Sequence, residues 1–207
     1  PGMLLEAMTS FGVGVEDEDR KRTWKADAEE CRKRGSLETA RAIYAHAIKT
    51  FPGKKGLWVR AAQLEKVAGR PDAMDELLKR AVQHCPQAEI LWLMAAKERW
   101  LQGDVPGARD VLEEAFVANP DSEDIWLAAF KLEFENREPE RARALLRKVR
   151  ERGDASERVW MKSAIVERET GDVAAERALL EEGLKKYPGF WKMWIMLGQL
   201  EEAHAAA

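Results

Sequence analysis

The sequence predicts an all-α fold, a right-handed α-solenoid of helix-turn-helix repeats with a period of 34 residues. Three observations support this prediction. A tryptophan returns every 34 residues, glycines and prolines return at fixed distances from it, and the apolar residues between them follow helical spacing. A fixed period of about 20–50 residues is typical of arrays in which each helical unit packs against its neighbours.

The tryptophan series sets the period. Its members are Trp24, Trp58, Trp92, Trp126, Trp160 and Trp194. Around Trp126 the sequence reads IWLAAFKLE, which leaves only a narrow polar stripe on a helix. Because a helix that is apolar nearly all round must be covered on several sides, we predict that each tryptophan is a structural plug between neighbouring helix pairs. Full burial of one such ring stabilises the fold by roughly 4–6 kcal/mol at most.

Glycines and prolines mark the expected ends of the helices. The glycines expected to close the first helix of a repeat in the left-handed conformation are Gly35, Gly69, Gly103 and Gly171. The residues expected to N-cap the second helix follow directly: Ser36, Asp104 and Asp172. The prolines expected to end the second helix are Pro52, Pro86, Pro120 and Pro188.

These signals divide the chain into three parts. Residues 1–20 form an N-terminal segment expected to be partly irregular, residues 21–193 form five helical repeats, and residues 194–207 form the first helix of a sixth. Because the chain begins with Pro1 and stops partway through this sixth repeat, we expect it to be part of a longer protein.

Composition excludes several classes of function. Charged residues make up 34% and apolar residues 45%, which is too apolar for a disordered chain. The net charge of −3 gives no general attraction to nucleic acid or to an anionic membrane. No apolar run approaches the roughly 18 residues of a membrane span. Cys31 and Cys85 lie in expected helices, and free thiols there indicate a reducing compartment, cytosol or nucleus.

No group of residues predicts catalysis, a cofactor or a metal site. His46, His84 and His204 are scattered along the sequence, without partners at metal-ligand spacing. There is no glycine-rich phosphate loop and no nucleophile elbow. We therefore expect no enzyme, no small-molecule substrate and no catalytic, cofactor-binding or metal-binding residue. The oligomeric state is left open.

One set of positions is a candidate surface for a protein partner. Eight residues after successive tryptophans come Lys66, Trp100, Phe134 and Arg168. Two neighbouring aromatic rings with cationic edges would suit a partner-binding patch. The position also lies beside the apolar arc of the helix, so the alternative is that both rings are packed in the core, and this alternative is favoured.

A second set of positions is a candidate RNA-contacting stripe. The stretch from Arg137 to Arg158 is locally basic, and Arg143, Arg147 and Arg150 share one helical face within it. Glutamates interleave with these arginines and no aromatic residue accompanies them. Solvated ion pairs within the helix are therefore the favoured interpretation.

Further features recur around the tryptophans. Most repeats carry a glutamate seven residues after the tryptophan and an Ala-Arg pair on the second helix. We expect ion pairs between Glu133 and Arg143 and between Glu167 and Arg177. Four departures stand out: Cys31 and Arg99 replace the glutamate, Asp75 replaces the arginine and Asp154 replaces the proline. With these exceptions the pattern resembles the half-a-tetratricopeptide (HAT) repeat of RNA-processing scaffold proteins, a close relative of the tetratricopeptide repeat (TPR).

Longer stretches resemble one family within that class. ARAIYAHAIKTFPGKKGLWVRAAQLEK (40–66), HCPQAEILWLMAAKERWLQGDVPGAR (84–109) and NPDSEDIWLAAFKLEFEN (119–136) are similar to the pre-mRNA-processing-factor-six family. The similarity extends from about Gly12 to Glu202. It implies a nuclear, non-catalytic scaffold that binds other splicing proteins of the tri-snRNP in the spliceosome, with RNA contact secondary. Two alternatives stay open: a generic TPR-type peptide-binding adaptor, and an RNA-contacting solenoid of another RNA-processing complex.

Overall fold

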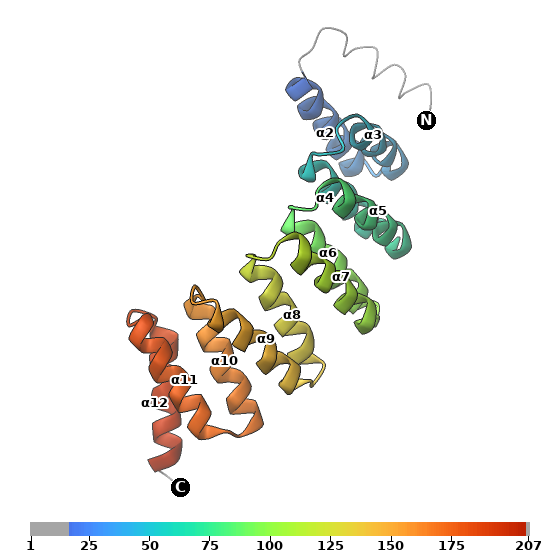
Figure 1. The fold of residues 1–207 in the computed structure, drawn as a ribbon. Helices are drawn as coiled ribbons and strands as arrows, with labels where there is room; N and C mark the ends of the chain where they lie inside the picture. The colour runs from blue at the N-terminus through green and yellow to red at the C-terminus, as the bar shows by residue number, and fades with distance from the viewer. Residues whose placement is uncertain (1–16, 206–207) are drawn as a thin grey trace. The chain divides into compact units, whose positions relative to one another are not determined.

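The computed structural model describes residues 17–205, and every regular element within that range is an α-helix (Figure 1). The helices are α2 (Asp17–Lys33), α3 (Leu37–Thr50), α4 (Lys55–Val67), α5 (Pro71–His84), α6 (Glu89–Leu101), α7 (Val105–Ala118), α8 (Glu123–Glu135), α9 (Pro139–Glu151), α10 (Glu157–Thr170), α11 (Val173–Lys186) and α12 (Trp191–Ala205). The predicted all-α fold of repeated helix pairs is confirmed.

The chain forms two compact units, which divide after Pro120. In the first unit α2 packs on α3, α4 on α5 and α6 on α7, and each pair contacts the next. The first helices α4 and α6 also contact each other directly. In the second unit α8 packs on α9 and α10 on α11, while α9 contacts α10 and α11 contacts α12. Within each unit, therefore, helical hairpins stack in sequence order, as in an α-solenoid.

The helix ends follow the sequence signals closely. Gly35, Gly69, Gly103 and Gly171 have φ angles of 81°, 66°, 84° and 79°, so the prediction of left-handed closures is confirmed. The carboxylates of Asp104 and Asp172 accept hydrogen bonds from backbone N–H groups at the start of the second helix. Ser36 occupies the same position, but its hydroxyl makes no capping hydrogen bond.

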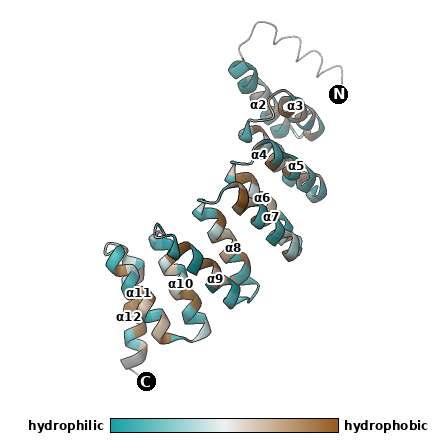
Figure 2. Ribbon diagram, viewed as in Figure 1, coloured by the Kyte–Doolittle hydropathy of each residue, from teal (hydrophilic) through white to brown (hydrophobic). Residues whose placement is uncertain are grey.

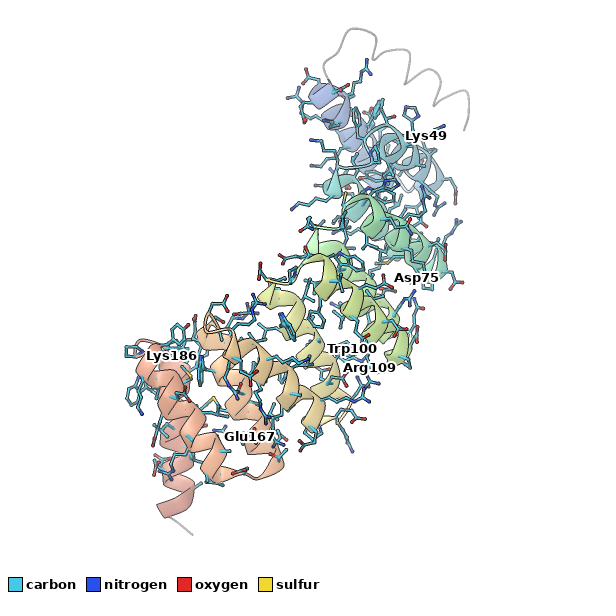
Figure 3. The ribbon with its side chains drawn as sticks, in the orientation of Figure 1. Lys49, Asp75, Trp100, Arg109, Glu167 and Lys186 are labelled. Atoms are coloured by element: carbon cyan, nitrogen blue, oxygen red, sulfur yellow. The ribbon has the colours of Figure 1, made fainter. Side chains whose placement is uncertain are left out.

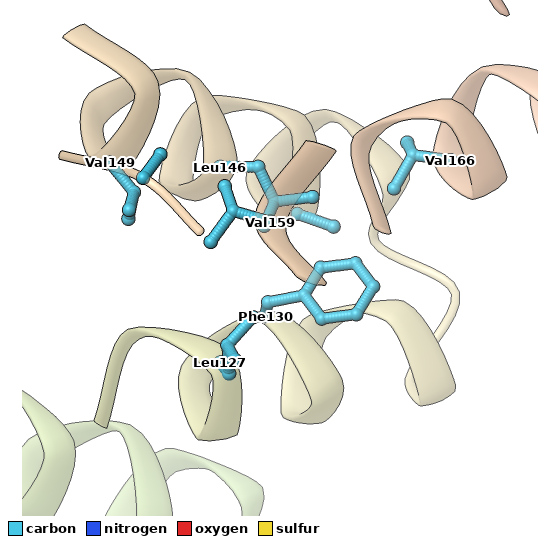
Figure 4. Close-up of a cluster of buried hydrophobic side chains, with 8 residues drawn as sticks. Leu127, Phe130, Leu146, Val149, Val159 and Val166 are labelled. Carbon is cyan, nitrogen blue, oxygen red and sulfur yellow. The ribbon is translucent and has the colours of Figure 1, made fainter. Parts of the chain in front are cut away.

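The cores come from the apolar faces of the helices. Figure 2 shows hydrophobic and hydrophilic stretches within the same helices, as expected for amphipathic elements. In the second unit, one cluster joins α8, α9 and α10 through Leu127, Phe130, Leu146, Val149 and Val159 (Figure 4). The α8–α9 hairpin thus buries part of its apolar surface against the hairpin that follows it.

The boundaries expected at the two ends fall close to helix starts. The N-terminal segment expected over residues 1–20 lies mostly outside the described residues, and its last part, 17–20, is already helical in α2. The last helix begins at Trp191 rather than at 194. None of the helices within residues 17–205 has both the length and the apolar character needed to cross a membrane.

Candidate functional site

The repeated tryptophans do not all occupy the same environment. Trp24, Trp58, Trp92 and Trp160 are buried, with exposed fractions of 7%, 0%, 6% and 3%. These four fill the space that a plug would fill. Trp126 is half-buried, and Trp194 on α12 is 54% exposed.

Trp58, Trp92 and Trp194 each donate a hydrogen bond to the loop that precedes their helix. The Nε1–H of Trp58 lies 2.7 Å from the carbonyl oxygen of Pro52. Trp92 and Trp194 make the same bond to Pro86 and Pro188, at 2.8 Å in each case. This bond explains why tryptophan and proline recur together at a constant spacing. The rigid proline turn presents its carbonyl group to the indole of the following helix.

The same loops also accept a hydrogen bond from the next repeat. The Cys85 thiol donates to the carbonyl oxygen of Pro52 at 3.4 Å, and the Asn119 amide donates to that of Pro86 at 2.9 Å. Both donors sit at the C-cap of a second helix. The loops at Pro52 and Pro86 are therefore each bonded to the tryptophan of the hairpin that follows and to the C-cap residue at the end of that same hairpin.

Trp160 departs from this arrangement. Its Nε1 is buried and has no hydrogen-bond partner. The preceding loop has Asp154 in place of the proline, and Gly153 there has a φ angle of 87°. The corresponding C-cap residue Cys85 has a φ angle of −132°. With this changed backbone, no carbonyl oxygen of the loop accepts the indole N–H of Trp160. The Tyr187 hydroxyl still donates to this loop, to the carbonyl oxygen of Ala155 at 2.6 Å.

Ion pairs connect the second helix of one repeat with the first helix of the next. Arg41 on α3 donates to both carboxylate oxygens of Glu65 on α4, at 2.5 and 3.0 Å. Arg143 on α9 bonds Glu167 on α10 at 2.8 and 2.6 Å; the position of Glu167 is labelled in Figure 3. Arg177 likewise bonds Glu201. The hydrogen bonds that Arg41 and Arg143 donate to these carboxylates raise the pKa of the two guanidinium groups.

The pairing expected within a hairpin, Glu133 with Arg143 and Glu167 with Arg177, is therefore wrong. Each arginine reaches forward by 24 residues, across the joint to the next repeat. The forward partner is favoured because the second helix of one hairpin packs side by side with the first helix of the next. The arginine and the glutamate can then both bury part of their side chains. Glu65 and Glu167 are 4% and 6% exposed.

At the joint between α5 and α6 the same pair is present with its charges exchanged. Asp75 holds the place of the arginine and Arg99 that of the glutamate, and Arg99 Nε lies 3.0 Å from Asp75 Oδ1. Burial acts to raise the pKa of Asp75, but hydrogen bonds from Lys79 and Arg99 outweigh it and hold that pKa below its usual value. Two departures from the repeat pattern thus compensate each other.

The residues of the candidate partner patch are mostly engaged. Lys66 lies 3.3 Å from Glu98, and Arg168 pairs with Glu176 at 2.7 Å. Phe134 packs against the core cluster of the second unit and stacks on Phe130, with ring centroids 5.4 Å apart. Trp100 is half-buried. Lys66 and Trp100 belong to the first unit, Phe134 and Arg168 to the second.

The candidate RNA-contacting stripe is also largely engaged within the protein. Arg143 is held by Glu167 and Glu140. The guanidinium of Arg150 lies 5.6 Å from the ring centre of Trp160, and burial lowers its pKa. Of the three arginines, only Arg147 is exposed.

Sequence reasoning missed a small basic hollow on the first helices of the first unit. It has a volume of about 340 Å³ and lies between α2 and α4. Its lining includes Arg32, Arg60, Lys66 and, at its rim, Val67, which is 63% exposed. Glu29 bonds Arg60 at 3.1 Å and also pairs with Arg32. The described residues hold no group of three or more potential metal ligands.

The comparisons with protein families agree with the fold. Two family models, both described as tetratricopeptide repeat, match residues 99–165 in one case and residues 55–98 and 157–200 in the other. Together they cover more than half of the chain. The chain also resembles the crystal structure of MamA protein, with a TM-score of 0.59 and 15% identity over 83% of this chain and 94% of that one.

Two curated relatives are more similar in sequence over shorter stretches. Pre-mRNA-processing factor 6 of Homo sapiens is 56% identical over 52 residues, 25% of this chain and 6% of that protein. Pre-mRNA-splicing factor prp1 of Schizosaccharomyces pombe is 44% identical over 72 residues, 35% of this chain and 8% of that protein. The chain thus spans only a small part of the length of these relatives, and the expected resemblance is confirmed. Tetratricopeptide-repeat models thus match this chain between residues 55 and 200, and parts of the chain are similar in sequence to the pre-mRNA-processing factors.

Proposed function

We propose that the chain is a non-catalytic protein-interaction scaffold of pre-mRNA splicing, with a place among the splicing proteins of the tri-snRNP in the nucleus. The observation that carries this proposal is the 56% identity to pre-mRNA-processing factor 6. Structural matches at about 15% identity would support the fold alone, whereas identity at this level extends to residues that the repeat pattern does not require.

The arrangement of charged groups favours a protein partner over RNA. Most arginines at the joints are neutralised by glutamates from the next repeat. A protein that binds RNA through its phosphates needs cations free to replace counterions. With two of the three stripe arginines engaged, such contact is secondary in this proposal.

Exposed apolar side chains on first helices offer the best surface for a protein partner. Val67 on α4 and Leu101 on α6 are each 63% exposed. They hold equivalent places in successive repeats, one period apart. Apolar contacts flanked by charged residues such as Lys66 are common at protein interfaces.

The test is an affinity capture from nuclear extract with the 207-residue chain as bait, read by mass spectrometry. We expect enrichment of splicing proteins relative to an unrelated TPR array. Val67→Asp with Leu101→Asp should lower this enrichment, whereas Val117→Asp, at an 86% exposed position on α7, is the matched control. Equal capture by the unrelated array, or capture of chaperones alone, would argue against the splicing role and for a generic adaptor.

A further inference from the structure

Three of the four buried tryptophans, Trp24, Trp58 and Trp160, are covered by cationic or aromatic side chains. His46 meets the ring of Trp24 edge-on, with ring centroids 4.8 Å apart. Trp58 is stacked by His84 at 5.6 Å, and the Arg80 guanidinium lies 5.6 Å from its ring centre. These contacts place positively charged or polarisable groups on the negative face of the indole.

Trp160 in the second unit is covered in a similar way. The ammonium of Lys186 lies 4.6 Å from its ring centre, in addition to the guanidinium of Arg150. The covering residues on the second helix follow a rule of position. His46 and Arg80 stand at the same distance after their tryptophans, and His84 and Lys186 stand about one helical turn further along.

Trp92 breaks this rule. At the two equivalent positions its repeat has Glu114 and Ala118. Within residues 17–205, no cationic or aromatic side chain lies over its ring in the manner seen at Trp58 and Trp160. Beside it is a hollow of about 360 Å³ between α5, α6 and α7, which we call the Trp92 hollow. This volume is within the range of about 300–1,000 Å³ that ligand-binding clefts have.

The Trp92 hollow has an apolar floor and two polar walls. Leu78, Val82, Trp92, Ala95 and Val111 form the floor. One wall carries Asp75, Lys79 and Arg99, which bind one another: Lys79 and Arg99 lie 2.8 and 3.0 Å from the Asp75 carboxylate. Their charges are satisfied within the wall.

The other wall, on α7, is acidic. It carries Asp110 and Glu114, both exposed. Neither has an ion-pair partner among the described residues. An aromatic ring beside two unpaired carboxylates favours a cation, because cation–π attraction and an ion pair then act on the same group. It disfavours a phosphate group.

We propose that the Trp92 hollow receives an arginine or lysine side chain from a partner protein. That side chain takes the place beside Trp92 that Arg80 and His84 hold at Trp58, and its charge pairs with Glu114 and Asp110. The proposal goes beyond a role in splicing and holds for any partner that presents such a residue.

The binding test uses the 207-residue chain and blocked amino acids as probes. N-acetyl-arginine methylamide is titrated to about 100 mM, because a single side chain is expected to bind in the millimolar range. N-acetyl-citrulline methylamide has the same shape without the charge. The tryptophan indole N–H signals are followed by NMR, and a Trp92→Phe variant assigns the Trp92 signal.

We expect a saturable shift of the Trp92 indole signal with the arginine probe, and binding at least about threefold weaker with the citrulline probe. Glu114→Arg should weaken arginine binding by about tenfold or more, since the introduced side chain fills the place itself. Glu114→Gln, which changes neither size nor helix propensity greatly, should give a smaller loss. Glu182→Arg is the matched control, because Glu182 stands in the same relation to Trp160 as Glu114 to Trp92.

Several results would overturn the proposal. The first is the absence of a saturable shift at Trp92 with the arginine probe. The second is an equal response to the citrulline probe, which would show that charge is not recognised. The third is unchanged binding by both Glu114→Arg and Glu114→Gln, or an equal loss in Glu182→Arg. Addition of a single-stranded RNA should leave the Trp92 signal unmoved, and a larger shift with RNA than with arginine would also contradict it.

Discussion

The loop before α4 and the loop before α10 occupy equivalent places in two repeats, yet only the first accepts a hydrogen bond from the tryptophan that follows it. Before α4, Pro52 accepts the indole N–H of Trp58 and the thiol of Cys85. Before α10, Asp154 replaces the proline and the buried indole N–H of Trp160 has no partner. Both rings are nevertheless fully packed and covered by cations. Packing of the ring is therefore the constant requirement of the joint, and the hydrogen bond is an addition to it.

The largest expected effect is the loss of stability when a buried tryptophan at a joint is truncated, compared with the loss when the exposed Trp194 is truncated. Trp58→Ala should lower the free energy of unfolding by about 3–5 kcal/mol, because the ring is fully buried. Trp194→Ala should cost much less, since Trp194 is 54% exposed. Urea unfolding followed by circular dichroism measures both. Similar losses at the two positions would contradict the view that burial at the joint gives the tryptophan its stabilising effect.

The next effect concerns the exchanged ion pair. Arg99→Glu should destabilise the protein by about 1–3 kcal/mol, because it places two carboxylates together at the joint of α5 and α6. The double change Asp75→Arg with Arg99→Glu recreates the orientation of Arg41 and Glu65 and should recover most of the loss. Thermal unfolding of the three proteins measures this recovery. A double variant as unstable as the single one would show that the two residues do not act as a pair.

A smaller effect isolates the hydrogen bond of the indole. Trp58→Phe removes a bonded N–H and leaves the Pro52 carbonyl without it, whereas Trp160→Phe removes an N–H that has no partner. The loss of volume is the same in both. We expect Trp58→Phe to cost about 1 kcal/mol more than Trp160→Phe, as measured by chemical unfolding. The opposite order would mean that the Trp160 N–H is satisfied in solution, for instance by a bound water.

The smallest effect depends on pH. Because the pKa of Asp75 is held below its usual value, its carboxylate stabilises the folded protein at neutral pH. This stabilisation is lost as the pH falls through the folded-state pKa, below the ordinary value of about 3.9. Between about pH 5 and pH 3 the native chain should lose up to about 1 kcal/mol more stability than Asp75→Asn. Parallel acid profiles would mean that Asp75 contributes nothing through its charge.

The sequence is sufficient to predict the features that all repeats share, but it predicts less well the contacts that differ from one repeat to the next. The period, the left-handed glycines and the buried places of Trp24, Trp58, Trp92 and Trp160 follow from local pattern and helical geometry. Proximity in sequence predicts the wrong partners for Arg143 and Arg177, because it favours pairing within one hairpin. Their true partners lie across the joint, where packing rather than sequence proximity decides.

For two departures from the repeat pattern, spacing alone is enough to predict a contact. Asp75 and Arg99 are separated along the chain by the same interval as Arg41 and Glu65. The exchange of charge at that interval indicates a contact. The Trp92 hollow is harder to predict from sequence. It exists because Glu114 and Ala118 leave one side of the Trp92 ring uncovered, and this depends on how α5, α6 and α7 pack together.

The exchanged pair also restricts how this array can change in length. A repeat protein gains and loses units most simply by whole periods. Loss of the one repeat that carries α4 and α5 would join α3 directly to α6 and bring Arg41 opposite Arg99, two like charges at a joint. Loss of α4 to α7 together would instead bring Arg41 opposite Glu133 and keep opposite charges at the joint, so the exchanged pair favours the removal of both hairpins over the removal of one.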